Sequence, residues 1–437
     1  MRTFLHITIR MLMILGWSSL VVACNYIGGA FEHRPEELSE NISPQARALI
    51  QRAFEDIDSS RLRDYHTHLL GMNTELNGTF VNEAWQSPFG GLVHYIQFEV
   101  YKSSAGITDT AQADAQYLGR LQNLIHFMPQ HGMFGLMAFD YFHDEHGTPQ
   151  KTLSTFHTPN HYMLKIVKEH PDVFFPIISI HPYRQDAEDA LRRFAKQGVR
   201  FVKWLPNAMG IHPASPSMND KLEAYYRLMR EYDMVLISHT GNEKATEAED
   251  FQHLGNPLFL KKPLDMGVKV IMAHVASLGE CQEEDAGICT PGTPYIDLAI
   301  GMLEDPQYKT LLFADISALT QDNRKDHLNT ILEKTSIHSN LINGSDYPLP
   351  AVNIVIQTRT LESSGYISSE ERTWLNEIYD YNPLLFDFVL KRTLRHTETG
   401  QKFPPSVFLE HPLLPTQQFV TDPINRIPPA VSKRANF

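Results

Sequence analysis

The sequence predicts an α/β protein built as a (β/α)8 TIM-type barrel. Short apolar or β-branched runs recur along the chain, helix-length segments separate them, and metal-binding residue types gather at their carboxyl ends. Eight such runs can be counted, at residues 61–68, 134–140, 174–181, 200–205, 234–239, 268–274, 311–317 and 340–346. They extend over somewhat more than the roughly 250 residues typical of this barrel, so we expect insertions. A doubly wound open sheet with scattered histidines is the alternative.

The first 23 residues have the pattern of a lipoprotein signal peptide. Residues 1–10 carry two arginines and no acidic residue, and residues 11–23 form an apolar stretch too short to span a bilayer comfortably. The segment ends Val21-Val22-Ala23-Cys24, which resembles the bacterial lipobox that places lipid on the cysteine. We expect an exported protein anchored in the cell envelope through Cys24. Asn25 is not the aspartate of an inner-membrane signal, which favours the outer membrane, on its periplasmic side. An ordinary cleaved signal peptide is the alternative.

Residues 24–60 are predicted to form a tether followed by one helix. Ser43 is the expected N-cap and Pro44 stands in the first turn, with Ala48, Phe54 and Ile57 on one face. We expect this helix to pack on the barrel, which we assign to residues 61–392.

The longest connection lies between the first two predicted strands, at residues 69–133. It contains a predicted helix at 113–128 and a stretch at 73–91 that is rich in Gly, Asn and aromatic residues. Such an insertion at the catalytic face of a barrel either forms a lid or packs on a neighbour.

The C-terminal part is predicted to be a helical extension followed by a tail. One helix should start near Ser368 and another after Asn382-Pro383. Residues 393–437, Pro-rich from Pro404, should lie on the surface.

Two histidines, His66 and His68, end the first predicted strand. Side chains two residues apart in a strand point to the same side, so both rings can bind one cation. Four later strands also end in candidate metal ligands, which are Lys203, His239, His274 and Asp346. Because the carboxyl ends of barrel strands meet at one face, we expect these side chains to lie together.

This ligand order resembles the amidohydrolase superfamily of metal-dependent hydrolases. His-x-His, Lys, His, His and Asp stand on strands one, four, five, six and eight. The sequence around them is similar to the amidohydrolase-2 branch, with Val-Lys-Trp-Leu-Pro at 202–206, Ser-His-Thr-Gly at 238–241 and Gly-Ser-Asp-Tyr-Pro at 344–348. The resemblance covers about residues 61–392.

The resemblance implies that His66, His68 and Asp346 bind a first metal ion, with Asp346 also acting as general base and then general acid. His239 and His274 bind a second ion, or His239 completes a one-metal site in which His274 orients the water. Neutral imidazoles and carboxylates suit divalent zinc, manganese or iron, and zinc is our first candidate. A bound metal lowers the pKa of water from about 15.7 towards about 7 and polarises a substrate carbonyl.

Lys203 has two readings under the same resemblance. In binuclear relatives the strand-four lysine is carboxylated by carbon dioxide and bridges two metals, which requires a neutral amine, as burial favours. In much of the amidohydrolase-2 branch a lysine in a similar Lys-x-x-Pro setting is no ligand and remains a buried cation. The sequence leaves both open.

Weaker candidates for substrate contact are His181, Trp204 and Asn207, together with Asp315, which can instead fix its strand end. Cys281 and Cys289 are predicted to form a disulfide beside the site, as an oxidising compartment allows. Two free thiols or a zinc-binding pair are the alternatives, because spacing does not show whether the sulfurs meet.

The predicted activity is a metal-dependent hydrolase in which metal-bound hydroxide attacks an amide, lactam, ester or lactone of a small molecule. The runner-up is a nonhydrolytic decarboxylase of a small aromatic or unsaturated acid, because the amidohydrolase-2 branch includes enzymes resembling aminocarboxymuconate-semialdehyde decarboxylase. That reading requires a basic residue for a carboxylate, and no arginine stands at a predicted strand end.

A noncatalytic metal-binding surface lipoprotein is a third reading, against which the complete ligand set speaks. The net charge of −13 and the lack of a basic stripe argue against a nucleic-acid partner. A homo-oligomer is compatible with the sequence, which does not determine the oligomeric state.

Overall fold

The computed structural model describes residues 33–285 and 287–416. The predicted signal peptide and Cys24 lie outside these residues. No helix within them is both long and apolar enough to cross a membrane.

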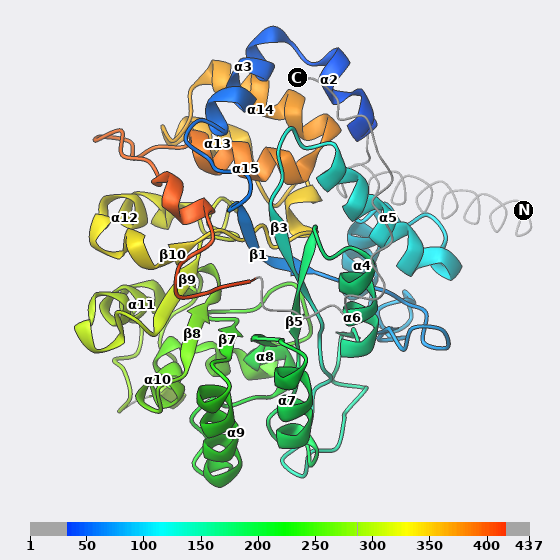
Figure 1. Cartoon of the computed structure of the whole chain (residues 1–437), viewed down its shortest axis with the longest axis vertical. Coiled ribbons are helices and arrows are strands. Elements are labelled where there is room, and N and C mark those ends of the chain that lie inside the picture. The colour runs from blue at the N-terminus through cyan, green and yellow to red at the C-terminus, as the bar shows by residue number, and fades with distance from the viewer. Residues whose placement is uncertain (1–32, 286, 417–437) are drawn as a thin grey trace, which may run out of the picture.

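Eight parallel strands form one sheet in the order β1-β3-β5-β6-β7-β8-β9-β10 (Figure 1). Their bounds are β1 Arg63–His68, β3 Met133–Met137, β5 Phe174–Ile178, β6 Phe201–Trp204, β7 Val235–Ser238, β8 Lys269–Met272, β9 Leu312–Asp315 and β10 Leu341–Ile342. Each overlaps one of the eight predicted runs, so the predicted barrel is confirmed.

The barrel closes where β1 meets β10 and the loop that follows β10. Tyr65 N donates to Asn343 O at 3.0 Å, and His68 N donates to Tyr347 O at 3.0 Å. In the other direction Asp346 N donates to His66 O at 2.7 Å. These bonds bring the histidines of the first strand beside the aspartate that follows the last.

Helices surround the sheet (Figure 1). One helix follows each strand in turn: α5 Ala113–His126, α6 Asn160–Glu169, α7 Ala187–Lys196, α9 Asn219–Glu231, α10 Lys261–Asp265, α11 Tyr295–Glu304, α12 Leu328–Glu333 and α15 Pro383–Thr393. The additional elements are α2 Leu38–Asn41, α3 Pro44–Ala53, β2 Phe80–Val81, α4 Leu92–Ser104, β4 Phe156–His157, α8 Pro206–Met209, α13 Thr358–Ser363 and α14 Ser369–Tyr381.

The N-terminal helix α3 begins where the sequence predicts. Ser43 Oγ accepts a hydrogen bond from Ala46 N at 3.1 Å, and Pro44 is the first helical residue. Phe54 is buried as expected, but Ala48 is only half-buried, and the buried face of the helix consists of Ala46, Leu49, Ile50 and Ala53. This face packs against α14 and α15.

Helix α4 in the long insertion was not predicted. Its sequence contains Val93, Ile96 and Val100 among several aromatic residues, and β-branched and aromatic side chains have modest helix propensity. No side chain caps its N-terminus, so the usual start signal is missing as well.

The C-terminal tail differs from the predicted surface segment. Leu414 is fully buried and joins the side chains that fill the barrel interior, among them Tyr65, Phe175 and Phe313. Tyr65 Oη donates to Leu414 O at 3.1 Å, and Glu410 forms an ion pair of 3.0 Å with Arg63 at the start of β1. This part of the tail therefore closes the amino-terminal end of the barrel.

The buried side chain of Lys391 links α15 to the loop after β10, where that loop meets β1. Lys391 Nζ donates to Gly344 O at 2.7 Å and to Asp387 Oδ2 at 2.6 Å. Asp64 Oδ1 accepts from His66 N at 2.9 Å and from Ser345 N at 3.0 Å. Burial raises the pKa of Asp387 to about 6, although the charge of Lys391 acts in the opposite direction.

The variant Lys391→Met is expected to lower the free energy of unfolding by about 3–5 kcal/mol, because Asp387 is left buried without its partner. Denaturant unfolding followed by circular dichroism measures this loss. The double variant Lys391→Met, Asp387→Leu should recover much of it, since no charge is then left unpaired. A single variant as stable as wild type would contradict this role for the pair.

Candidate metal centre

Three predicted ligands lie together where β1 meets the loop that follows β10. His68 Nε2 lies 3.1 Å from Asp346 Oδ1, and His66 Nε2 lies 3.3 Å from the same oxygen. One ligand atom from each of the three residues falls within 4.8 Å of the other two. Two imidazole nitrogens and one carboxylate oxygen facing a common point form a donor set that fits a divalent cation.

Asp315 at the end of β9 fixes the orientation of His66. Its Oδ2 lies 2.9 Å from His66 Nδ1, and its Oδ1 accepts from His274 N at 2.9 Å and from Ser317 N at 3.1 Å. The carboxylate thus accepts a hydrogen bond from the Nδ1–H of His66. This contact turns the Nε2 lone pair toward the other candidate ligands, as carboxylates behind metal-binding histidines do. The hydrogen bonds from the backbone of His274 and Ser317 agree with the predicted role of fixing the strand end, whereas the contact with His66 was not predicted.

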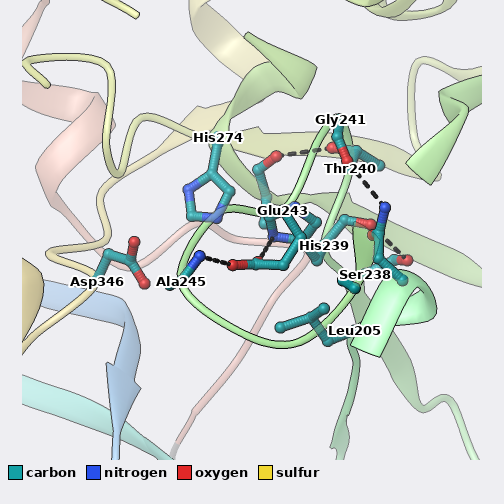
Figure 2. A network of polar contacts seen from close by, with 12 residues as sticks. Leu205, Ser238, His239, Thr240, Gly241, Glu243, Ala245, His274 and Asp346 are labelled. Atoms are coloured by element: carbon teal, nitrogen blue, oxygen red, sulfur yellow. Dashed lines mark hydrogen bonds and ion pairs between the residues drawn. The ribbon is translucent and has the colours of Figure 1, made fainter. Parts of the chain in front are cut away.

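His239 and His274 form the neighbouring half of the site. Their ring centroids are 5.0 Å apart, and those of His66 and His274 are also 5.0 Å apart. His274 Nδ1 lies 2.8 Å from Ser317 Oγ, and His239 Nδ1 lies 3.5 Å from Glu243 Oε2. Figure 2 shows the Glu243 carboxylate between the His239 ring and the backbone of Ala245, with His274 and Asp346 across the same space.

His239 Nε2 is buried and has no hydrogen-bond partner among the described residues. A buried nitrogen without a partner is costly unless something binds it, and a metal ion is the natural partner of a neutral imidazole.

His66, His239 and His274 are held neutral. Burial lowers the pKa of His66, His239 and His274 well below the usual 6.5, and nearby cations act in the same direction. Lys203 contributes to all three shifts, and Arg324 to those of His239 and His274. Neutral imidazole is the form that binds metal.

Lys203 is fully buried on β6, and its Nζ lies 3.1 Å from His66 Nε2. Burial lowers its pKa to about 8, although the charges of Asp315, Asp346 and Glu243 oppose the shift. The lowered pKa favours the neutral amine that carboxylation requires, while the nearby carboxylates favour the cation, so both predicted roles of this lysine stay open.

Asp346 is held ionised in spite of its burial. Burial raises its pKa, but its interactions with His66, His68 and Lys203, including the hydrogen bond from His68, outweigh burial and bring the pKa below 3.8. Its backbone has a left-handed φ of 61°, and His274 has a φ of 60°. Left-handed backbone at a residue other than glycine is strained, and it occurs here at two candidate ligands.

A cavity of about 450 Å³ opens from this cluster. The predicted ligands His66, His68, Lys203, His239, His274 and Asp346 all line it. The long insertion contributes an apolar wall that includes Leu70, Met72, Val81, Trp85, Phe98 and Ile107. The insertion thus shapes the binding space directly.

None of the three predicted substrate contacts lines the cavity. His181 Nε2 lies 2.8 Å from Met209 O, and Trp204 Nε1 donates to Ile180 O at 3.0 Å. Asn207 Nδ2 donates to Gln252 O at 3.1 Å. Each side chain supports a loop or packs against a helix.

Glu243 and Arg324 line the cavity beside the predicted ligands and were not predicted. Glu243 stands four residues after His239, a spacing that could have suggested a partner for that ring. Arg324 follows β9 by nine residues, in a loop whose sequence carries no motif. The absence of an arginine at the strand ends therefore gives no evidence against a substrate carboxylate.

Cys281 and Cys289 are bonded in the structure, with their Cα atoms 6.2 Å apart. The bond lies in the segment between β8 and α11, and His274 belongs to the start of the same segment.

No protein-family model matches the sequence, and no curated protein matches it either. Solved structures do align with the chain. An uncharacterized TIM-barrel protein from Bordetella bronchiseptica is 13% identical, with 66% of this chain and 86% of that chain covered and a TM-score of 0.43. A 5-carboxyvanillate decarboxylase from Sphingomonas paucimobilis is 10% identical, with 67% and 91% covered and a TM-score of 0.40. A protein provisionally named metal-dependent hydrolase from Lactobacillus casei is 16% identical, with 74% and 94% covered and a TM-score of 0.36.

The variant Asp315→Asn is expected to weaken metal binding by roughly 10–100-fold, because an amide cannot replace both carboxylate oxygens that orient His66 and the His274 backbone. Competition with a chelator of known affinity measures the change. Asp326→Asn on the exposed surface is the matched control and should bind as wild type does. Equal metal affinity in both variants would contradict the positioning role.

Proposed function

We propose that the protein is a metal-dependent enzyme of the amidohydrolase superfamily that acts on a small molecule held in the cavity. One observation carries the proposal. Nδ1 of His66, His239 and His274 faces Asp315, Glu243 and Ser317, respectively. This arrangement leaves Nε2 of each ring as the ligand atom, and such partners behind a ring are typical of metal sites.

The residues support zinc as our first candidate and allow one or two ions. His66, His68 and Asp346 would hold the first ion, and His239 with His274 the second or the remainder of a single site. The metal would supply an activated water and polarise a substrate carbonyl. Lys203 would either bridge two ions as a carboxylate or act as a buried cation.

Asp346 is proposed to be the general base and acid. It is ionised at neutral pH, so it can accept a proton from water. Oδ1 faces both histidines of β1, and the second oxygen of the same group would hold the proton until the leaving group takes it. This sequence of transfers fits hydrolysis of an amide, lactam, ester or lactone.

A decarboxylase is the second candidate, and Arg324 is the observation that favours it. A nonhydrolytic decarboxylase must bind a carboxylate beside the metal, and this arginine lines the cavity with His274 and Asp346. The solved structures that align with the chain include proteins with names of both kinds.

The variant Asp346→Asn is expected to stay folded and to lose about 10²–10⁴-fold in turnover, because the amide cannot carry the proton. Turnover is measured on a panel of lactones, esters and N-acyl amino acids for hydrolysis, and of hydroxybenzoates for release of carbon dioxide. Asp265→Asn outside the cavity is the control. Unchanged turnover in Asp346→Asn would contradict the mechanism, and the wild-type products decide between the two reactions.

We also propose that the protein is exported and anchored by lipid on Cys24. The bonded pair Cys281 and Cys289 supports export, because disulfides persist in oxidising compartments. The full chain expressed in a bacterial host should partition into the membrane fraction and incorporate labelled palmitate, and Cys24→Ser should do neither. Label in the Cys24→Ser variant would contradict the anchor.

A further inference from the structure

Arg324 is a buried cation whose hydrogen bonds are incomplete. The residue is 5% exposed, and its Nη1 donates to Ser277 Oγ at 3.1 Å. Its Nε is buried with no hydrogen-bond partner among the described residues, and no described carboxylate forms an ion pair with it. An isolated buried charge costs several kcal/mol, so a guanidinium left in this state calls for a partner that is not part of this chain.

The nearby carboxylates already have other partners. Glu243 faces His239 and accepts from Ala245 N, and Asp346 faces His66 and His68. Asp315 accepts from the backbone of His274 and Ser317. The charges of these three carboxylates act to raise the pKa of Arg324, but none of the three accepts a hydrogen bond from its guanidinium.

Another buried arginine of the same chain shows what a satisfied guanidinium looks like. Arg63 donates to Thr416 Oγ1, to the carbonyl groups of Ser60 and Leu62, and to the carboxylate of Glu410. Arg63 stands at the closed end of the barrel and does not line the main cavity, whereas Arg324 does.

The geometry selects the kind of partner. Because Ser277 takes Nη1, the edge formed by Nε and Nη2 remains, and this edge presents two parallel N–H groups that match the two oxygens of a carboxylate. Arg324 lines the same cavity as His274 and Asp346, so a substrate bound there would reach the metal centre. The long insertion adds apolar residues to the wall, among them Leu70, Trp85 and Phe98.

We propose that Arg324 binds the carboxylate of an acidic substrate whose apolar body lies against the wall made by the long insertion. This inference rests on the proposed function of the site and adds the substrate class. It applies to either reaction, because the carboxylate is the leaving group in a decarboxylation and an anchor in a hydrolysis.

The test compares three probes of one shape: 3-phenylpropanoate, 3-phenylpropanamide and 2-phenylethylphosphonate. Binding to the full exported protein is measured by calorimetry, in the metal-loaded form and after removal of metal with a chelator. Arg324 is present in both forms, so the preference for the carboxylate over the amide should be about tenfold or more in each. A preference that disappears with the metal would overturn the proposal, because the ion alone would then bind the carboxylate.

Variants separate Arg324 from general charge. Arg324→Met should lose the preference for the carboxylate, and Arg324→Lys should keep only part of it, because an ammonium lacks the planar pair of donors. Lys102→Met removes a different cation of the cavity wall, paired with Glu99, and should retain the preference. Retention in Arg324→Met, or loss in Lys102→Met equal to that in Arg324→Met, would overturn the proposal.

Two wild-type results would also overturn it without any variant. Equal binding of the carboxylate and the amide would exclude a carboxylate site, and tighter binding of the phosphonate than of the carboxylate would assign the site to phosphate-like groups. Metal content is measured on the same samples to separate the two proposals. A protein that holds no metal but prefers the carboxylate would refute the metal-dependent activity and leave the carboxylate site standing.

Discussion

The contact between β1 and the segment after β10 positions the candidate metal centre. Backbone hydrogen bonds from His68 to Tyr347 and from Asp346 to His66 join the first and last strands of the barrel. The same bonds set the two imidazoles and the carboxylate around one point. The same hydrogen bonds therefore close the barrel and bring the candidate ligands together. Lys391 on α15 adds a further bond to this contact through the Gly344 carbonyl.

Burial gives the site its chemical character. His66, His239 and His274 are neutral, Lys203 has a lowered pKa and Asp346 is ionised, although all five side chains are buried. Burial lowers the pKa of the three histidines and of Lys203, and interactions with His66, His68 and Lys203 lower that of Asp346. Asp315 and Glu243 lie behind two of the rings and orient them. Charges arranged in this way cost free energy in an apolar barrel, and the binding of a cation and of an anionic substrate can offset that cost.

The sequence predicted the strands and the six candidate ligands because both depend on local order. A strand of period two places His66 and His68 on one side, and barrel topology brings strand ends together. The same alternation explains why Trp204, a predicted substrate contact, does not line the cavity. Lys203 faces inward, so its neighbour Trp204 faces outward, where it packs on Tyr225 and Tyr226 of α9.

Other features depend on contacts between distant segments and had no local signal. Asp315 meets His66 across 249 positions of sequence, and Arg324 enters the cavity from an irregular loop. Leu414 fills the end of the barrel although nothing in its surroundings marks a core residue. Glu243 is the exception, since its spacing from His239 could have been noticed.

The central claim is that His66 and His68 belong to a metal site, and metal content tests it most directly. Mass spectrometry of the chain lacking residues 1–24, exported and purified without chelator in bicarbonate buffer, should find at least about one equivalent of a transition metal such as zinc. The double variant His66→Ala, His68→Ala should lose it. About two equivalents in wild type that fall on Lys203→Ala would identify a carboxylated bridge, whereas about one that does not change would identify a buried cation. A wild-type chain without metal, or equal content in the histidine variant, would contradict the account.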